Sequence, residues 1–227
     1  MKYDNFLKLM DKLLGESGCP WDREQTHESL RPYLLEECYE TIESINNGDM
    51  DSLKEELGDV FLQVVFHAKL AEISGIFTMD DIISAVTQKL ISRHSHIFGT
   101  DEAASAAEVL KIWEANKQKE QPRNTSQAIN AIPKALPALM RASKILKRAA
   151  KDAKEAPDVE SIYKDITTGL QNLAEPGAAC FEIYGKVLLQ MVNLSAILGV
   201  NAEFSLTNAV EGFINTNYAE TPAACGL

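Results

Sequence analysis

Apolar residues recur every three or four positions along nearly the whole chain, and no segment shows a sustained alternation of apolar and polar residues. The first pattern is typical of amphipathic α-helices, whereas alternation is typical of half-buried strands. The sequence therefore predicts an all-α protein. We expect helices near residues 3–15, 28–47, 51–74, 79–93, 105–120, 134–151, 158–174, 178–199 and 203–218.

A polar segment divides the predicted helices into two groups. Residues 122–133 contain two prolines and several amide and hydroxyl side chains, without a convincing apolar face. We expect a linker here, between a first domain at 1–121 and a second at 134–227. The glycine, the glutamine and the apolar positions of 55–65 recur in register at 182–192. We interpret this echo as an internal duplication, the alternative being a chance match between amphipathic helices.

The charge balance and the cysteines narrow the class of protein. The chain has 22 Lys and Arg against 33 Asp and Glu, a formal net charge of −11, which disfavours a nucleic-acid-binding face. No run approaches the roughly 20 apolar residues of a membrane-spanning helix, and the charged N-terminal segment is not typical of a secretory signal. Four scattered cysteines without C-x-x-C spacing predict free thiols, so we expect a cytoplasmic protein with no membrane partner.

Two acidic helices give the strongest chemical signal. Glu37 and Glu40 are three residues apart in one helix, and Glu56 and Asp59 have the same spacing in the next. Residues at this spacing share a helix face. An antiparallel hairpin through a turn at 46–49 would bring the four carboxylates together. We expect the apolar stripes beside them to be buried, namely Leu34, Leu35, Cys38, Tyr39, Ile42 and Ile45 in the first helix and Leu53, Leu57, Val60, Phe61, Val64 and Val65 in the second.

Four converging carboxylates repel one another, and a divalent cation relieves that repulsion. Oxygen ligands without Cys or His favour Mg²⁺ or Mn²⁺ over zinc. Gly58, inside the second acidic helix, would let another backbone approach closely. The alternative interpretation is a solvated acidic face that binds no metal.

A third helix carries positive charge. Lys89 and Arg93 are four residues apart and project together, which mildly destabilises a helix unless an anion lies between them. Together with metal-binding acids, they favour a phosphate ester or anhydride as substrate. The alternative is that these cations only complement the helix dipole.

The histidines carry weaker signals. Glu24-x-x-His27 is half of a di-iron motif, but a ferritin-like centre needs two such pairs, so we interpret His27 as a surface or supporting residue. We interpret His67 as buried packing and His94-Ser95-His96 as a hydrogen-bonded loop end. The sequence contains no P-loop, G-x-G-x-x-G, H-E-x-x-H or G-x-S-x-G motif.

Four motifs occur together in a fixed order. They are Gly18-Cys19-Pro20-Trp21-Asp22-Arg23-Glu24-Gln25-Thr26-His27, Leu35-Glu36-Glu37-Cys38-Tyr39-Glu40, Glu55-Glu56-Leu57-Gly58-Asp59 and Arg93-His94-Ser95-His96-Ile97-Phe98. In this combination the chain resembles the MazG nucleoside triphosphate pyrophosphohydrolases over about residues 1–120. Ser95 departs from the family, which usually has proline there.

The resemblance implies an all-α fold in which tandem MazG-type domains form four-helix bundles through dimerisation, so that the active unit is at least a homodimer. It also implies Mg²⁺-dependent hydrolysis of NTPs or dNTPs to the monophosphate and pyrophosphate, as in housecleaning of the nucleotide pool. Carried over by motif, Glu37, Glu40, Glu56 and Asp59 are metal ligands, Lys89 and Arg93 bind the triphosphate, and Glu36 is a further catalytic acid that orients a water or a ligand.

The segment 132–142 resembles the start of the second domain of two-domain members, which supports the duplication. That second copy lacks the acids of the first. In the register above, Lys164, Asp165 and Thr168 replace the first acidic cluster, Ile183 and Lys186 replace Glu56 and Asp59, and Gly212 and Thr216 take the basic positions. We expect a second domain that is catalytically inactive and serves dimerisation or stability. The alternative to an enzyme is a non-catalytic nucleotide-sensing or interaction module of the same fold.

Overall fold

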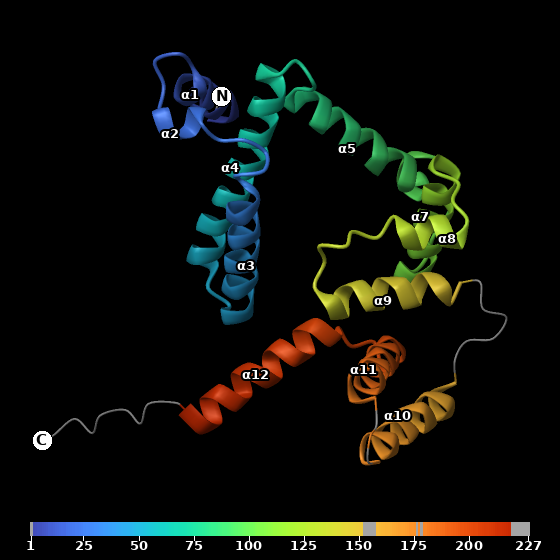
Figure 1. Ribbon diagram of the computed structural model, residues 1–227. Coiled ribbons are helices and arrows are strands. Elements are labelled where there is room, and N and C mark those ends of the chain that lie inside the picture. The colour runs from blue at the N-terminus through green and yellow to red at the C-terminus, as the bar shows by residue number, and fades with distance from the viewer. Residues whose placement is uncertain (1, 152–157, 176, 178, 219–227) are drawn as a thin grey trace, which may run out of the picture. The chain divides into compact units, whose positions relative to one another are not determined.

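A computed structural model describes residues 2–151, 158–175, 177 and 179–218. Within these residues every regular element is a helix, as the apolar periodicity predicts, and the chain divides into two compact units at residues 1–117 and 118–227 (Figure 1). The helices are α1 (Lys2–Leu14), α2 (Pro20–Arg23), α3 (Arg31–Asn47), α4 (Met50–Ile73), α5 (Met79–Arg93), α6 (Ser95–Phe98), α7 (Ala106–Glu120), α8 (Thr125–Asn130), α9 (Ala138–Ala149), α10 (Val159–Leu173), α11 (Cys180–Ile197) and α12 (Ala202–Tyr218).

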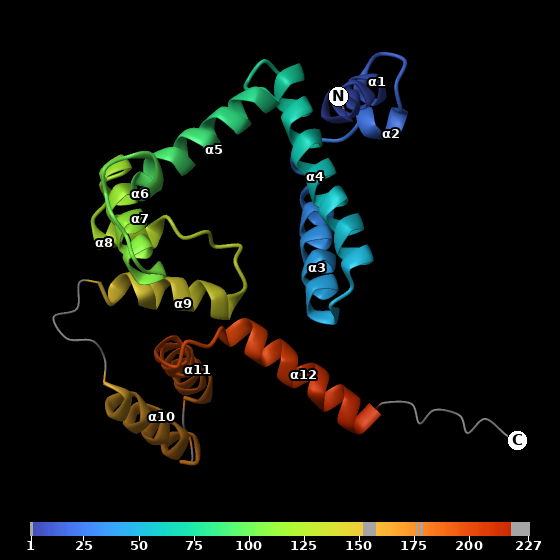
Figure 2. The same cartoon turned by 180° about the vertical axis from the view of Figure 1, so that it is seen from behind.

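An antiparallel hairpin of α3 and α4 is the centre of the first unit (Figures 1 and 2). Gly48 ends α3 with a left-handed backbone at φ 68°, which glycine adopts without the steric cost of a side chain. Asp49 then caps α4, because its side chain accepts hydrogen bonds from the backbone N–H groups of Asp51 and Ser52. These two adjacent residues give the tight turn that the sequence predicts between the acidic helices.

The core of the first unit lies at the C-terminal half of α4. Its buried residues include Met10 from α1, Leu30 from the loop before α3, and Val65 and Phe66 from α4. Lys69 on the same half of α4 is also buried, and its ammonium group forms ion pairs with Asp11 at 2.7 Å and Glu72 at 2.8 Å. This packing holds α1 against the end of α4 that is remote from the hairpin turn, and leaves the acidic end of the hairpin outside the core.

The apolar stripes of α3 and α4 are buried only in part. Val65 is buried as predicted, and five further members are half-buried, namely Leu34, Ile42, Leu53, Val60 and Val64. Leu35, Tyr39 and Leu57 are 58%, 53% and 51% exposed, whereas Ser44 is buried and Glu37 is half-buried. Polar side chains therefore take part in the contact between the two helices, and half of the expected stripe stays exposed. The prediction was wrong for these exposed residues, because periodicity shows which residues share a face, but not which face meets the neighbouring helix.

The glycine expected to permit close helix packing does not do so. A Cβ atom built on Gly58 would have no atom within 4 Å beyond its own helix. The close approach occurs in the second unit, where a Cβ on Gly169 of α10 would lie 2.5 Å from a methyl group of Val187 on α11. Gly58 therefore contributes nothing to the contact between α3 and α4.

The second unit is built around a hairpin of α10 and α11, with α8 and α12 packed on α9. Ile162, Ile166, Val187 and Leu194 form its buried cluster. The segment 122–133, which we expected to be a linker, contains α8. Asn124 and Gln127 form a capping box at the start of that short helix, and these local hydrogen bonds stabilise it without an apolar face.

The remaining sequence expectations concern cysteines and membrane helices. Cys19, Cys38 and Cys180 are free thiols, and Cys225 lies outside the described residues. In the described part of the chain no single helix is long and apolar enough to cross a membrane. The bent pair α11 and α12 reaches the required length and composition only when the two helices are taken together, across a bend of 104°.

Candidate metal centre

Three carboxylates converge between the helices of the first hairpin. Each of Glu37, Glu56 and Asp59 offers one oxygen, and these three oxygens all lie within 4.8 Å of one another. Glu37 comes from α3, while Glu56 and Asp59 lie one turn apart on α4. All three side chains are half-buried. The three-residue spacing places Glu56 and Asp59 on one face of α4, and the hairpin brings Glu37 of α3 close to them.

The electrostatics of the cluster show how closely the acids interact. Burial raises the pKa of Glu37, and the charges of Asp59 and Glu40 raise it further. Burial also raises the pKa of Glu56, with Glu40 as the next cause. Glu40 therefore adjoins the cluster, although its oxygens are outside the group of three. A raised pKa means that these carboxylates gain stability from a bound proton or cation.

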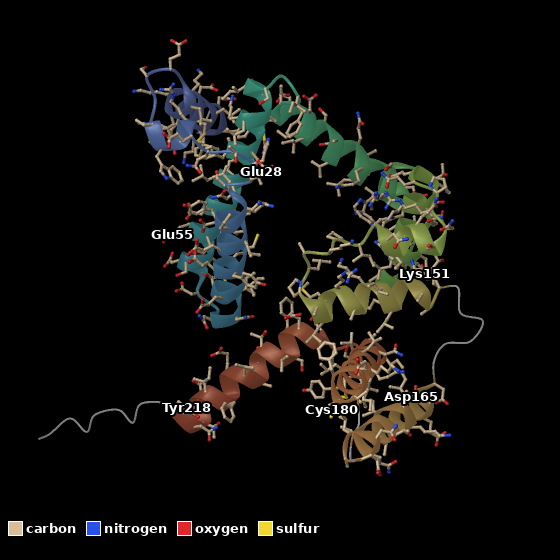
Figure 3. The ribbon with its side chains drawn as sticks, viewed as in Figure 1. Glu28, Glu55, Lys151, Asp165, Cys180 and Tyr218 are labelled. Atoms are coloured by element: carbon tan, nitrogen blue, oxygen red, sulfur yellow. The ribbon has the colours of Figure 1, made fainter. Side chains whose placement is uncertain are left out.

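The donor set fits a hard divalent cation. All of its ligand atoms are carboxylate oxygens, with no sulfur or imidazole nitrogen, and Mg²⁺ and Mn²⁺ prefer such ligands. Acidic side chains line this hairpin in Figure 3, where Glu55 is labelled on α4. Glu36, the other acid of the first motif, is exposed and lies outside the group of three. Three of the four predicted ligands thus come together, and the fourth lies beside them.

The predicted basic residues lie on a different part of the unit. Helix α5 packs on α4 and α6, and in Figures 1 and 2 it leaves the end of α4 that is remote from the acids. Lys89 is exposed, and the guanidinium carbon of Arg93 lies 5.3 Å from the ring centre of Trp113, a cation–π contact. Within one chain the structure therefore does not place Lys89 and Arg93 beside the acidic cluster.

A histidine pair lies near the opposite end of α4 from the acids. Nδ1 of His27 and Nδ1 of His67 are 2.7 Å apart, and their rings are nearly parallel. Burial lowers the pKa of His67, and His27 lowers it further. The sequence predicted a surface or supporting role for His27 and buried packing for His67, without a contact between them. No local spacing signals a contact between residues 40 positions apart, because it depends on how the loop before α3 packs on α4.

The loop after α5 is hydrogen-bonded as its sequence suggested. His94 Nδ1 lies 2.7 Å from the carbonyl oxygen of Leu90, and the His94 ring packs edge-on against Trp113. The hydroxyl of Ser95 donates to Asp101 at 2.5 Å and accepts from the amide of Asn116 at 2.7 Å. Ser95 therefore connects the start of α6 to the loop after it and to α7.

Fold and site together define an all-helical protein with a cluster of three carboxylates, suited to a divalent cation, in a helical hairpin. The MazG nucleotide pyrophosphohydrolase domain matches residues 25–98, which include all three acids. The chain is 42% identical to the nucleoside triphosphate pyrophosphohydrolase/pyrophosphatase MazG of Thermotoga maritima over 214 residues, 93% of this chain and 82% of that protein. The chain belongs to the MazG family.

Two further relatives illustrate the range of the family. The chain is 40% identical to the nucleoside triphosphate pyrophosphohydrolase of Escherichia coli over 219 residues, 92% of this chain and 83% of that protein. It is 42% identical to that of Mycolicibacterium smegmatis over 145 residues, 64% of this chain and 44% of that protein. The similarity to the first two proteins extends through both units, so the second unit belongs to the same shared architecture.

Proposed function

We propose that this protein is a nucleoside triphosphate pyrophosphohydrolase, which converts an NTP or dNTP and water into the monophosphate and pyrophosphate. Relatives that match more than nine-tenths of the chain carry this activity in their names. The observation that carries the proposal is the convergence of Glu37, Glu56 and Asp59 within 4.8 Å, inside the segment that matches the family domain.

The acids of the hairpin have two tasks in this reaction. Glu37, Glu56 and Asp59 would hold Mg²⁺, with Glu40 beside them, and Mn²⁺ could replace it. Bound Mg²⁺ neutralises phosphate charge and makes water more acidic. A carboxylate of the cluster takes the proton of the water that attacks the α-phosphorus, and the bond from that phosphorus to the bridging oxygen breaks.

The exposed apolar stripe supports a homodimer. Leu35, Tyr39 and Leu57 lie on the outer face of the hairpin, and a second hairpin packed against them would complete a four-helix bundle. We infer that Lys89 and Arg93 reach the triphosphate only in this dimer, because within one chain they do not lie beside the acids. We therefore assign triphosphate binding to these two residues in the dimer, and the orienting role to Glu36.

The second unit has no comparable carboxylate group among its described residues. The positions that correspond to the acids line a cavity of about 500 Å³ between α10 and α11, where Lys164 and Lys186 stand near Asp165. The Asp165 carboxylate accepts a hydrogen bond from Gln190 at 2.9 Å. Ammonium groups repel a divalent cation, so hydrolysis in this protein belongs to the first unit, and the second supports the structure.

A panel of NTPs and dNTPs tests the proposal. We expect Mg²⁺-dependent release of pyrophosphate from several of them by the full chain, and none by Glu56→Ala. Glu182→Ala serves as the control, because Glu182 lies on α11 of the second unit. Binding of triphosphates without release of pyrophosphate would instead identify a nucleotide-sensing module. Full activity of Glu56→Ala would show that the site is misassigned.

A further inference from the structure

The cavity between α10 and α11 carries a charge opposite to that of the acidic cluster in the first unit. The corresponding positions of the first hairpin hold five acids with a formal charge of −5, namely Glu36, Glu37, Glu40, Glu56 and Asp59. The second hairpin has two lysines and one aspartate at these positions, besides a threonine and an isoleucine, so its formal charge there is +1. In a chain with a net charge of −11, this local excess of positive charge favours an anion.

Two lysines from different helices line this cavity, Lys164 from α10 and Lys186 from α11. An acid precedes each of them by four residues on the same helix, Glu160 on α10 and Glu182 on α11, a spacing at which helical side chains can pair. In the part of the chain that the structure describes, neither lysine forms an ion pair or a hydrogen bond with these acids or with any other group. Both ammonium groups are therefore available to a ligand that enters the cavity.

The acid of the cavity is already hydrogen-bonded. Asp165, labelled on α10 in Figure 3, accepts a hydrogen bond from Nε2 of Gln190 on α11 at 2.9 Å. This bond offsets part of the repulsion between the carboxylate and an entering anion, and it links the two helices beside the lysines. Thr168 and Asn172 also line the cavity, and their hydroxyl and amide groups can donate hydrogen bonds to anionic oxygens.

From these observations we infer that the cavity between α10 and α11 binds a phosphate anhydride without a metal ion, either pyrophosphate or the phosphate chain of a nucleotide. Ammonium groups from two helices suit a ligand with at least two negative groups, and their hydrogen bonds to phosphate oxygens are charge-assisted. The volume of about 500 Å³ is in the usual range for small-molecule sites, roughly 300–1,000 Å³. An anion site in the second unit goes beyond the proposed function. Only the choice of a phosphate anhydride rests on it, because that reaction consumes and releases such compounds.

Titration calorimetry of the full chain with pyrophosphate in EDTA tests the inference, because EDTA removes the metal through which the first unit would bind phosphate. We expect binding that weakens about tenfold in Lys186→Met and in Lys164→Met, which keep an aliphatic side chain but lose the charge. Lys186→Arg keeps the charge and should keep most of the affinity. Adding Mg²⁺ should weaken this binding, because the cation neutralises the phosphate charge that the lysines recognise.

A matched control comes from the same unit. Lys144 is an exposed lysine on α9 that does not line the cavity, so Lys144→Met should bind pyrophosphate in EDTA as tightly as the wild type. No binding in EDTA would overturn the inference. So would full affinity in both cavity variants, or an affinity for orthophosphate as high as that for pyrophosphate.

Titration with ATP in EDTA identifies the source of the phosphate chain. Tighter binding of ATP than of pyrophosphate would assign the cavity to a nucleotide. Equal or weaker binding of ATP would assign it to pyrophosphate itself. Both outcomes support the inference, provided that the affinity depends on Lys164 and Lys186.

These binding measurements do not depend on turnover, so they separate failure of the anion site from failure of the proposed function. If no pyrophosphate is released from NTPs but metal-free binding depends on Lys186, the anion site stands and the enzymatic proposal falls. If pyrophosphate is released and no metal-free binding occurs, the anion site is wrong and the enzymatic proposal stands.

Discussion

Replacing Glu37 by glutamine should stabilise the metal-free protein and at the same time remove most of its stabilisation by Mg²⁺. In the absence of metal, Glu37 shares the cluster with Asp59 and Glu56, and its raised pKa reflects burial and the neighbouring charges. Glutamine has nearly the same shape but no charge, so the repulsion disappears. The cation then loses one of its ligands.

The size of the first effect follows from the geometry. Two unit charges 4.8 Å apart repel by about 0.9 kcal/mol at the dielectric constant of water, so the Glu37–Asp59 pair contributes on the order of 1 kcal/mol. For a chain of this length, about 1 kcal/mol corresponds to roughly 2–4 °C in Tm. Mg²⁺ at a hundredfold excess over its Kd stabilises the wild type by about 2.7 kcal/mol, and Glu37→Gln should lose most of this gain.

Thermal unfolding followed by circular dichroism measures both effects, in EDTA and in 10 mM MgCl₂ at pH 7.5. Glu43→Gln is the matched control, because Glu43 is an exposed acid on the same helix and lies outside the cluster. It should leave both Tm values within a degree of the wild type. If Glu37→Gln lowers the Tm in EDTA, or if its Tm rises with Mg²⁺ as much as that of the wild type, then the acids do not form a repulsive metal centre.

Three further predictions test the packing around the site. Gly18→Ala should destabilise the protein by about 1–3 kcal/mol in urea unfolding, because its Cβ would lie 2.0 Å from the carbonyl oxygen of Leu13. Gly58→Ala should instead stabilise the protein by up to about 1 kcal/mol, because a Cβ at this position on α4 meets no other atom. Equal effects of the two substitutions on the free energy of unfolding would contradict this description of the packing. Because the pKa of His67 is below its ordinary 6.5, the unfolded chain takes up this proton first as the pH falls. The Tm of the wild type should therefore decrease between pH 7.5 and pH 5.5, and the Tm of His67→Asn should decrease less. If the Tm of both proteins decreases equally, the histidine pair is not responsible. Leu35→Glu should reduce the mass measured by light scattering from that of a dimer, twice 25.0 kDa, to that of a monomer, 25.0 kDa. Leu110→Glu is the control, because Leu110 is also exposed but lies on α7, and this variant should stay dimeric. A dimer in both variants would exclude the hairpin face as the interface.

The helices were predictable to within a few residues because long amphipathic segments have a clear period. The helix over 79–93 has the predicted bounds, and those of α3 and α4 differ only at their ends. Helices α2, α6 and α8 are four to six residues long, too short to show that period. They depend on local features instead, such as Pro20 at the start of α2 and the capping box of α8.

In the candidate site, too, the features that follow from helix geometry were predictable, and those that depend on the packing between segments were not. Helix geometry alone places Glu56 and Asp59 on one face, so their spacing in the sequence was enough to find them. The contact between His27 and His67 depends on how the loop before α3 packs on α4, and it leaves no pattern in the sequence. The exposed stripe of Leu35 and Tyr39 has the same origin, since periodicity does not say which face of a helix meets its partner.

A crystal of the full chain grown with Mn²⁺ and α,β-methylene-ATP tests the central claim most directly, because anomalous scattering locates manganese independently of the model of the protein. We predict an anomalous peak bounded by carboxylate oxygens of Glu37, Glu56 and Asp59 and by phosphate oxygens of the nucleotide. A nucleotide bound elsewhere, with these acids solvated and no anomalous peak among them, would contradict the account.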